Sequence, residues 1–221
     1  KQIYIMYVGP DIVQDGLVVV LDAGSTRSYP GTGATWFDLS GNGNDGTLSA
    51  TSIGTTASGT MTFDGVDDTV TINYPNLTSS NFTVIGVSKR TNSAGRMIAG
   101  KNNWLLGHWN TSMRQYFSAG WVTGAGSSPA TSTTNDSNVH IWCGTGDISA
   151  DRYKFRDDNV EYTTNTTAGS AGPNGFVLGA YLAGGPSEYG AGTITVLLVY
   201  NRVLTDAEID QNFNAQKTRF L

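Results

Sequence analysis

The sequence predicts an all-β protein, built as a two-sheet antiparallel jelly-roll sandwich with a short C-terminal helix. First, the 221 residues include 28 glycines and many Ser, Thr and Asn residues, a composition that favours short strands and turns. Second, short apolar segments recur at the spacing typical of a sandwich. Third, the chain closes with an apolar strand that leads into a capped helix. We expect one domain at residues 15–221, preceded by an N-terminal arm at residues 1–14.

The predicted strands begin at residues 17–22, and a long glycine-punctuated loop follows at 23–45. Residues 60–63 and 69–72 are predicted to form a β-hairpin, because Asp64-Gly65 supplies the positive φ of a tight turn. Further short strands are expected at residues 82–89, 97–100, 104–108, 114–117, 139–147, 153–156, 160–163 and 175–178.

The closing segment predicts a buried strand followed by a helix. The strand at residues 192–200 is apolar on both faces near its end, which indicates that it is covered on both sides. Thr205 and Glu208 have the spacing of a capping box, and Leu204 and Ile209 that of a hydrophobic staple. The helix is therefore expected to lie on the sandwich.

Charge and cysteine content exclude several classes of protein. The formal charge of -5 and the lack of a basic run argue against nucleic acid and anionic membrane surfaces as partners. The one cysteine, Cys143, rules out an internal disulfide, and its apolar neighbours indicate a buried side chain.

The N-terminal arm is a candidate assembly anchor. Its apolar stretch is too short to cross a bilayer and is interpreted as an edge strand or an anchoring arm. The candidate assembly contacts are Ile3, Tyr4, Ile5 and Tyr7.

Several motifs occur in a fixed order: LVVVLD at 17–22, WFDLSGNGNDGTL at 36–48, FDGVDD at 63–68, FTV at 82–84, and the closing segment at 192–213. Together they resemble the laminin-G-like, concanavalin A-like family, and their wording is similar to a subgroup found in bacteriophage virion proteins. The resemblance implies a jelly roll that binds glycans or proteins on its loop rim, sometimes with calcium.

Catalytic motifs are missing from the sequence. The E-x-D-x-x-E strand of related sandwich glycosidases does not occur, and neither does a G-x-S-x-G nucleophile elbow. Of the glutamates, Glu208 is assigned to the helix cap, while Glu161 and Glu188 stand alone in sequence. His108 is interpreted as the end of a strand or a ligand contact, and His140 as the start of a buried strand. We therefore expect a protein that is not an enzyme.

Two segments carry acids that could serve a cation. Asp64, Asp67 and Asp68 lie on one tight turn, which is either solvated or bridged by Ca²⁺, with Asp22 as an additional ligand if the fold brings it near. The Asp38 loop resembles the start of a calcium loop but lacks its closing glutamate, so we interpret it as a turn.

Aromatic residues in polar loops indicate a carbohydrate site, because sugar rings stack on aromatic faces while short polar side chains bind the hydroxyls. Core packing for Trp104 and Trp121, and subunit contacts for Tyr181 and Tyr189, are the alternative interpretation. Trp36 and Trp142 are assigned to the core. The candidate binding residues are Trp104, Trp109, Trp121, Tyr181, Tyr189, Asn110 and Arg114.

These observations and the resemblance lead to two functional hypotheses. The first is a phage virion structural protein, a capsid decoration or fibre-associated module on the virion surface. It would dock on other virion proteins and on copies of itself through the arm and one sandwich face. The second is a calcium-assisted lectin or adhesin that binds host-surface glycan through its loop aromatics. A third hypothesis, a glycan-cleaving enzyme, has less support from the sequence.

Overall fold

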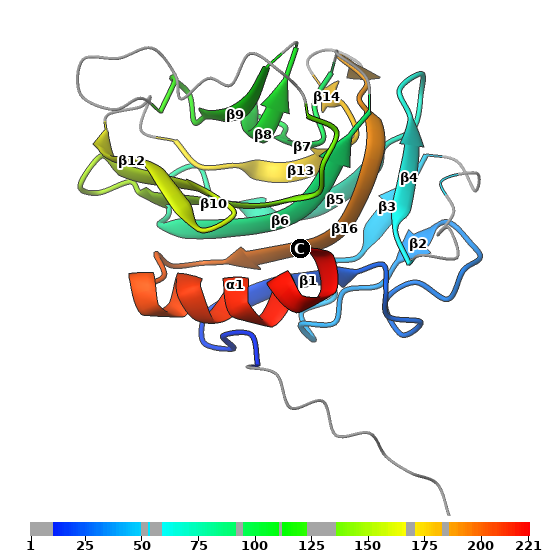
Figure 1. The fold of residues 1–221 in the computed structure, drawn as a ribbon, viewed down its shortest axis with the longest axis horizontal. Helices are drawn as coiled ribbons and strands as arrows, with labels where there is room; N and C mark the ends of the chain where they lie inside the picture. Colours follow the sequence, from blue (N-terminus) through cyan, green and yellow to red (C-terminus); the bar gives the residue numbers. More distant parts are fainter. Residues whose placement is uncertain are drawn as a thin grey trace, which may run out of the picture.

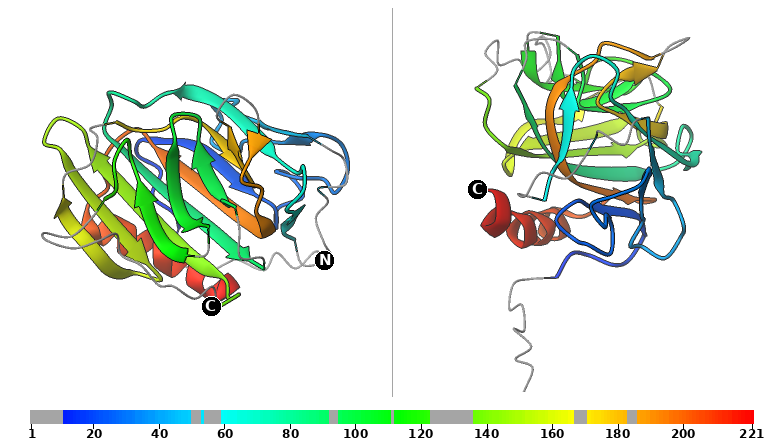
Figure 2. Two further views of the ribbon diagram at one scale, coloured as in Figure 1. Left: turned by 90° about the horizontal axis from the view of Figure 1, so that it is seen from above. Right: turned by 90° about the vertical axis from the view of Figure 1, so that its right-hand side faces the viewer.

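The computed structural model describes residues 11–49, 53, 59–91, 95–110, 112–122, 136–166, 171–182 and 186–221. Two antiparallel sheets lie face to face, and helix α1 (Asp206–Phe220) covers the outer face of one of them (Figures 1 and 2). The predicted sandwich with a C-terminal helix is confirmed. Within the described residues, no helix combines the length and the apolar character needed to span a membrane.

We call the sheet beneath α1 the helix-side sheet and the other the far sheet. The helix-side sheet has the order β1-β16-β6-β10-β11-β12, with β4 also paired to β16. Its strands are β1 (Leu17–Asp22), β4 (Met61–Asp64), β6 (Phe82–Arg90), β10 (His140–Asp147), β11 (Arg152–Asp157), β12 (Val160–Thr166) and β16 (Ala191–Tyr200).

The far sheet has the order β2-β3-β5-β13-β7-β8-β9. Its strands are β2 (Thr35–Trp36), β3 (Gly46–Leu48), β5 (Val70–Asn76), β7 (Ile98–Gly100), β8 (Trp104–Trp109), β9 (Ser112–Phe117) and β13 (Asn174–Leu178). A small ribbon of β14 (Tyr181–Leu182) and β15 (Pro186–Ser187) stands beside it.

The main core lies between the two sheets and is built from residues in register. One row crosses the far sheet through Leu48, Val70, Leu178, Ile98 and Leu106, each opposite the next. All five are buried in the same apolar cluster. Successive side chains on a strand point to opposite faces, so the residues directly before and after each member of this row lie on the outer face of the far sheet.

Trp36 and Trp142 are fully buried in this core, as predicted. The closing strand β16 is buried on both faces from Ile194 to Tyr200. Its inward side chains join the main core, while Val196 and Leu198 belong to a second cluster beneath α1. The expectation of a strand covered on both sides is confirmed.

Helix α1 begins as the sequence predicts. The Thr205 side chain accepts a hydrogen bond from the Glu208 amide, and the Glu208 carboxylate accepts one from the Thr205 amide, which completes the capping box. Leu204 and Ile209 are both buried in the second cluster. The apolar side of the helix thereby closes the outer face of the helix-side sheet.

The predicted hairpin at residues 60–72 is wrong. β4 pairs with β16 in the helix-side sheet, whereas β5 pairs with β3 and β13 in the far sheet. Met61 and Val70 both point into the main core, from opposite sides of it. The Asp64-Gly65 turn therefore carries the chain from one sheet to the other instead of closing a ladder between neighbours.

The loop expected at residues 23–45 contains the short strand β2 and covers the free edge of β1. The Asp38 carboxylate accepts a hydrogen bond from the Val20 amide at 2.8 Å. The side chains of Ser40 and Asn44 both donate to the Val18 carbonyl, at 3.0 and 2.8 Å. The glycine-rich loop thus takes the place of a neighbouring strand.

Candidate functional site

Three aromatic side chains gather at the β8–β9 end of the far sheet. The Trp109 ring lies 5.0 Å from that of Trp121, and the Trp121 ring lies 5.1 Å from that of Phe117. Phe117 is opposite Leu105, which alternates with core-facing neighbours, so this cluster lies on the outer face. All three aromatic side chains are partly exposed. Their planes are tilted by 49° between Trp109 and Trp121 and by 85° between Phe117 and Trp121, so the cluster offers single aromatic faces of the kind on which sugar rings stack.

An ion pair lies against this aromatic cluster. Nε of Arg96 donates to Oε2 of Glu188 at 2.6 Å, and the indole N–H of Trp109 donates to the same oxygen at 3.2 Å. The Arg96 guanidinium also donates to Asn103 at 2.8 Å and lies 4.0 Å above the Tyr181 ring. The pair therefore fixes the orientation of Trp109 through its ring nitrogen.

Close approach of two backbone segments brings this pair together. The Arg96 amide donates to the Glu188 carbonyl at 2.9 Å, and Arg96 forms a bridge with Tyr189. A Cβ on Gly95, whose φ is +77°, would lie 2.2 Å from the Tyr189 carbonyl oxygen. Only a glycine lets the segment before β7 meet the segment after β15 so closely.

Most of the predicted carbohydrate residues meet at this site. Trp109, Trp121, Tyr181 and Tyr189 are all partly exposed around the Arg96–Glu188 pair. Asn110 is exposed and directly follows Trp109, with a positive φ of 51°. The Arg114 side chain lies outside the described residues, as do the candidate assembly contacts Ile3, Tyr4, Ile5 and Tyr7.

The prediction that Trp104 belongs to the carbohydrate site is wrong. Trp104 is fully buried in the main core, where its ring meets those of Phe82, Tyr116 and Phe176 edge to face. Its side chain points inward because it shares the alternation of Leu106 on β8. It cannot stack on a ligand at the surface.

The sequence interpretation missed the two charged members of the site, Arg96 and Glu188. Glu188 stood alone because its partner is 92 positions away. No short-range pattern joins the two. The available signal was an acid in a Gly-rich segment beside Tyr189, together with an arginine directly after a glycine.

His108 is not a ligand contact, because it is buried within β8 against Trp142, with ring centres 5.1 Å apart. His140 starts the buried strand β10, as predicted. Its Nδ1 lies 2.8 Å from an Asp157 oxygen and 3.0 Å from an Asp158 oxygen. Both histidines therefore belong to the interior.

Each glutamate has a cationic partner. Glu208 receives two hydrogen bonds from Arg202, at 3.0 and 2.6 Å, and Glu161 lies 3.3 Å from Lys154. With Glu188 held by Arg96, the glutamates stand in three separate ion pairs on different elements. They do not form two carboxylates facing each other across a sugar.

The turn acids lie close enough to share a cation, with ligand oxygens of Asp64, Asp67 and Asp68 within 4.8 Å of one another. Burial, followed by the neighbouring charges, raises the pKa of Asp68 despite a hydrogen bond from the Asp64 amide. Three carboxylates suit calcium in kind but fall short of the about six to eight oxygens that it takes.

Asp22 and Asp38 do not extend this set. Asp22 lies opposite Val196 on β16, whereas Asp64 lies opposite Ala191, five positions along the same strand. Both Asp22 oxygens are bound by Arg219 at 2.8 Å. The Asp38 carboxylate accepts hydrogen bonds from its own loop and from β1, which confirms its interpretation as a turn residue.

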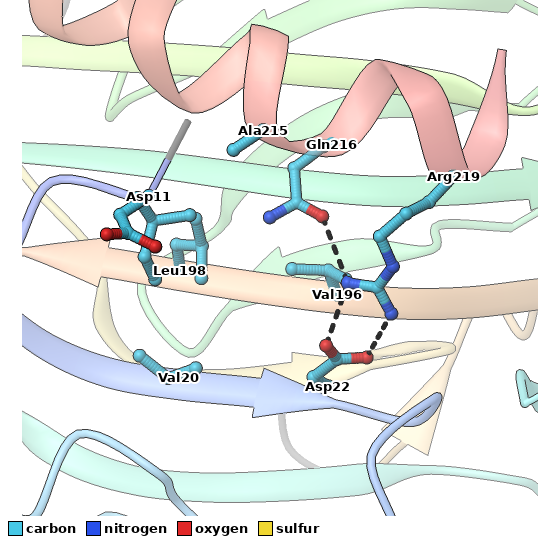
Figure 3. Close-up of a pocket in the computed structure, with 9 residues that line it drawn as sticks. Asp11, Val20, Asp22, Val196, Leu198, Ala215, Gln216 and Arg219 are labelled. Carbon is cyan, nitrogen blue, oxygen red and sulfur yellow. Dashed lines mark hydrogen bonds and ion pairs between the residues drawn. The ribbon is translucent and has the colours of Figure 1, made fainter. Parts of the chain in front are cut away.

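A separate cavity of about 320 Å³ lies between α1 and the helix-side sheet (Figure 3). Val20, Val196 and Leu198 form its apolar floor, and the Asp22–Arg219 pair closes one end. Asp11, where the described part of the chain begins, lies at its rim together with Ile12.

Comparison with known proteins finds similarity at the level of the three-dimensional structure only. No protein-family model and no curated protein matches the chain. Among solved structures, the Trypanosoma rangeli sialidase in complex with sialic acid has a TM-score of 0.61 at 16% identity, covering 93% of this chain and 34% of the sialidase. The chain thus spans about a third of the sialidase's length.

Two other similar structures are domains of larger proteins, one in complex with a sugar and one described as a binding domain. Domain 4 of AbnA, a GH43 extracellular arabinanase from Geobacillus stearothermophilus, in complex with arabinotriose, has a TM-score of 0.54 at 19% identity. The match covers 90% of this chain and 98% of that domain. The binding domain of Paraclostridial Mosquitocidal Protein 1 has a TM-score of 0.56 at 13% identity, covering 91% of this chain and 52% of that one. At these identities the likeness establishes a shared β-sandwich fold.

Proposed function

We propose that this domain binds carbohydrate, without cleaving it, on the outer face of the far sheet. The observation that supports this most strongly is the partly exposed Trp109–Trp121 pair, in which a direct hydrogen bond holds Trp109 beside the Glu188 carboxylate. Sugar recognition needs an apolar face for the ring and a fixed polar group for the hydroxyls, and this arrangement supplies both. The arabinotriose complex of the similar arabinanase domain supports the proposal.

Replacement of Trp109 tests this function. Trp109→Ala is expected to weaken glycan binding at least about tenfold, or about 1.4 kcal/mol, because it removes the stacking surface. Isothermal titration with the best glycan from an array measures the loss. Phe37→Ala removes an exposed aromatic side chain after β2, at the opposite edge of the sheet, and should leave binding unchanged. An array with no bound glycan, or equal losses in the two variants, would contradict the proposal.

A second function, self-association through the N-terminal arm, is favoured by the cavity beneath α1. The arm joins the domain at Asp11, on the rim of this apolar cavity, and its sequence at residues 3–8 is apolar. We propose that residues 1–10 of one copy contact this cavity in a second copy. Membership of a phage particle stays a prediction, since phage proteins are not among the three structures named above.

Light scattering tests this association. The full chain is expected to form oligomers, and a variant without residues 1–10 should be monomeric. Ala215→Trp, which fills the cavity from α1, should also dissociate the oligomer while the far-ultraviolet circular dichroism stays unchanged. A full chain that remains monomeric at high concentration would refute the proposal.

A further inference from the structure

We infer that the site selects neutral sugars, with the free oxygen of Glu188 accepting a ligand hydroxyl and turning away sugars that carry a carboxylate or sulfate. This inference rests on the proposed carbohydrate function and adds the ligand class. It makes Glu188 the residue that sets specificity.

The Glu188 carboxylate presents one occupied and one available oxygen. Oε2 accepts from Arg96 and Trp109, whereas Oε1 has no hydrogen-bond partner among the described residues. Because Oε2 is anchored twice, Oε1 holds a fixed position beside the Trp109 ring. A hydroxyl of a stacked sugar can donate to it, and a hydrogen bond to a charged acceptor is stronger than a neutral one.

The two members of the ion pair are unequally exposed. The Arg96 side chain is 5% exposed, and that of Glu188 is 39% exposed. A ligand arriving from solvent therefore meets the carboxylate, while the guanidinium lies behind it. Between these two described side chains, the exposed charge is therefore the negative one.

Arg96 is not available to compensate an acidic ligand. Its guanidinium is held by Glu188, by Asn103 and by the Tyr181 ring. Turning it toward a ligand carboxylate would break these contacts and leave the Glu188 charge unpaired. The formal charge of -5 on the whole chain adds to the repulsion of anions.

A matched pair of ligands tests the inference on the unmodified protein. Neutral galacto-oligosaccharides and galacturonate oligomers of equal length differ by one carboxylate per ring, and an array that includes neutral arabinose, xylose and glucose oligomers completes the panel. Neutral members are expected to bind at least tenfold more tightly than their acidic counterparts. The affinity for the neutral sugars should change less than about twofold between 50 and 500 mM salt, because no attraction between opposite charges of protein and ligand drives their binding.

Glu188→Gln then tests the cause. It keeps an oxygen acceptor and removes the charge, so the preference for neutral over acidic ligands should shrink at least threefold. Acidic sugars that bind the unmodified protein as tightly as neutral ones would overturn the inference but leave carbohydrate binding intact. An array with no bound sugar of either class would overturn both. If Glu188→Gln does not fold, the comparison on the unmodified protein alone decides.

Discussion

His108 and His140 show how neighbouring side chains of one type take opposite charges. Burial, together with the charges of Arg90 and His140, lowers the pKa of His108 well below its usual value. Burial also acts to lower the pKa of His140, but hydrogen bonds to Asp157 and then Asp158 outweigh it and raise the pKa to about 10. Around neutral pH the His108 ring is therefore neutral and the His140 ring is charged. Neither has the pKa near 7 that suits a general base.

Gly107 illustrates a single-atom constraint on the core. Its φ is +96°, and an added Cβ would lie 2.8 Å from the Trp142 ring. Gly107→Ala is expected to cost clearly more than about 1 kcal/mol, because it combines backbone strain with a clash. Chemical denaturation measures the change in the free energy of unfolding.

Gly33→Ala is the matched control for that prediction. Gly33 has nearly the same φ, +91°, but no atom lies within 4 Å of its added Cβ. It should therefore show the backbone strain alone. Equal losses in the two variants would mean that Trp142 moves aside freely and that the clash contributes nothing.

At the scale of single elements, α1 is tied down at its start by charge as well as by its cap. Arg156 of β11 lies 2.6 Å from Asp206 and 2.9 Å from Asp210, so the first turns of the helix are fastened to the sheet below. At the other end, Arg219 binds Asp22 at the end of β1. The helix thus bridges strands on both sides of β16.

The acid stability of α1 is expected to depend on Glu208. Hydrogen bonds from Arg202 and then from the Thr205 amide lower the pKa of the carboxyl from 4.5 to about 2. A lowered pKa contributes stability above pH 4.5 that is lost as the pH falls toward 2. Urea midpoints measured across this range should fall for the unmodified chain and fall less for Glu208→Gln.

Glu161→Gln serves as the comparison, because it removes another glutamate paired with a cation, on β12. It should keep the acid sensitivity of the unmodified chain. If Glu208→Gln loses stability in acid as steeply as Glu161→Gln does, the Glu208 carboxylate is not the source of the acid sensitivity.

Strand positions were largely predictable, while strand partners were not. Apolar alternation located β1, β6, β10 and β16 to within about two residues, a match to the usual uncertainty of element ends. β2 and β3 escaped notice because two or three residues are too few to show a period. The hairpin at Asp64-Gly65 failed because a turn sequence specifies a reversal of direction and not the sheet that receives the returning strand.

The site was predictable in its aromatic part only. Trp109 and Tyr181 were predictable because they lie in polar loops, which is a local feature of the sequence. In the structure both side chains contact the Arg96–Glu188 ion pair. The burial of Trp104 depends on which face of β8 turns inward, and flanking Asn and Gly residues do not reveal it. The Arg96–Glu188 pair joins segments that only the fold brings together.

At the scale of the whole molecule, the core between the sheets draws on elements from both ends of the chain. Val19 of β1, Met61 of β4 and Ile194 of β16 share it with far-sheet residues such as Phe176. Neither sheet can therefore unfold without exposing apolar surface of the other. Such contacts are typical of one cooperative unit.

We expect a single unfolding transition. Tryptophan fluorescence and far-ultraviolet circular dichroism should give the same midpoint in urea, since Trp36 and Trp104 of the far sheet and Trp142 of the helix-side sheet share one core. Two separated midpoints would show that the sheets, or the helix and the sandwich, unfold independently.

The loop that covers β1 also bears on how the molecule behaves when concentrated. An uncovered edge strand is a template on which other chains can add strands and grow into fibrils. Ser40 and Asn44 use the Val18 carbonyl, and Asp38 uses the Val20 amide, so these backbone groups are not available to a passing chain. The D-L-S-G-N-G-N loop therefore protects this edge against amyloid-like growth, while it leaves the outer face of the far sheet open.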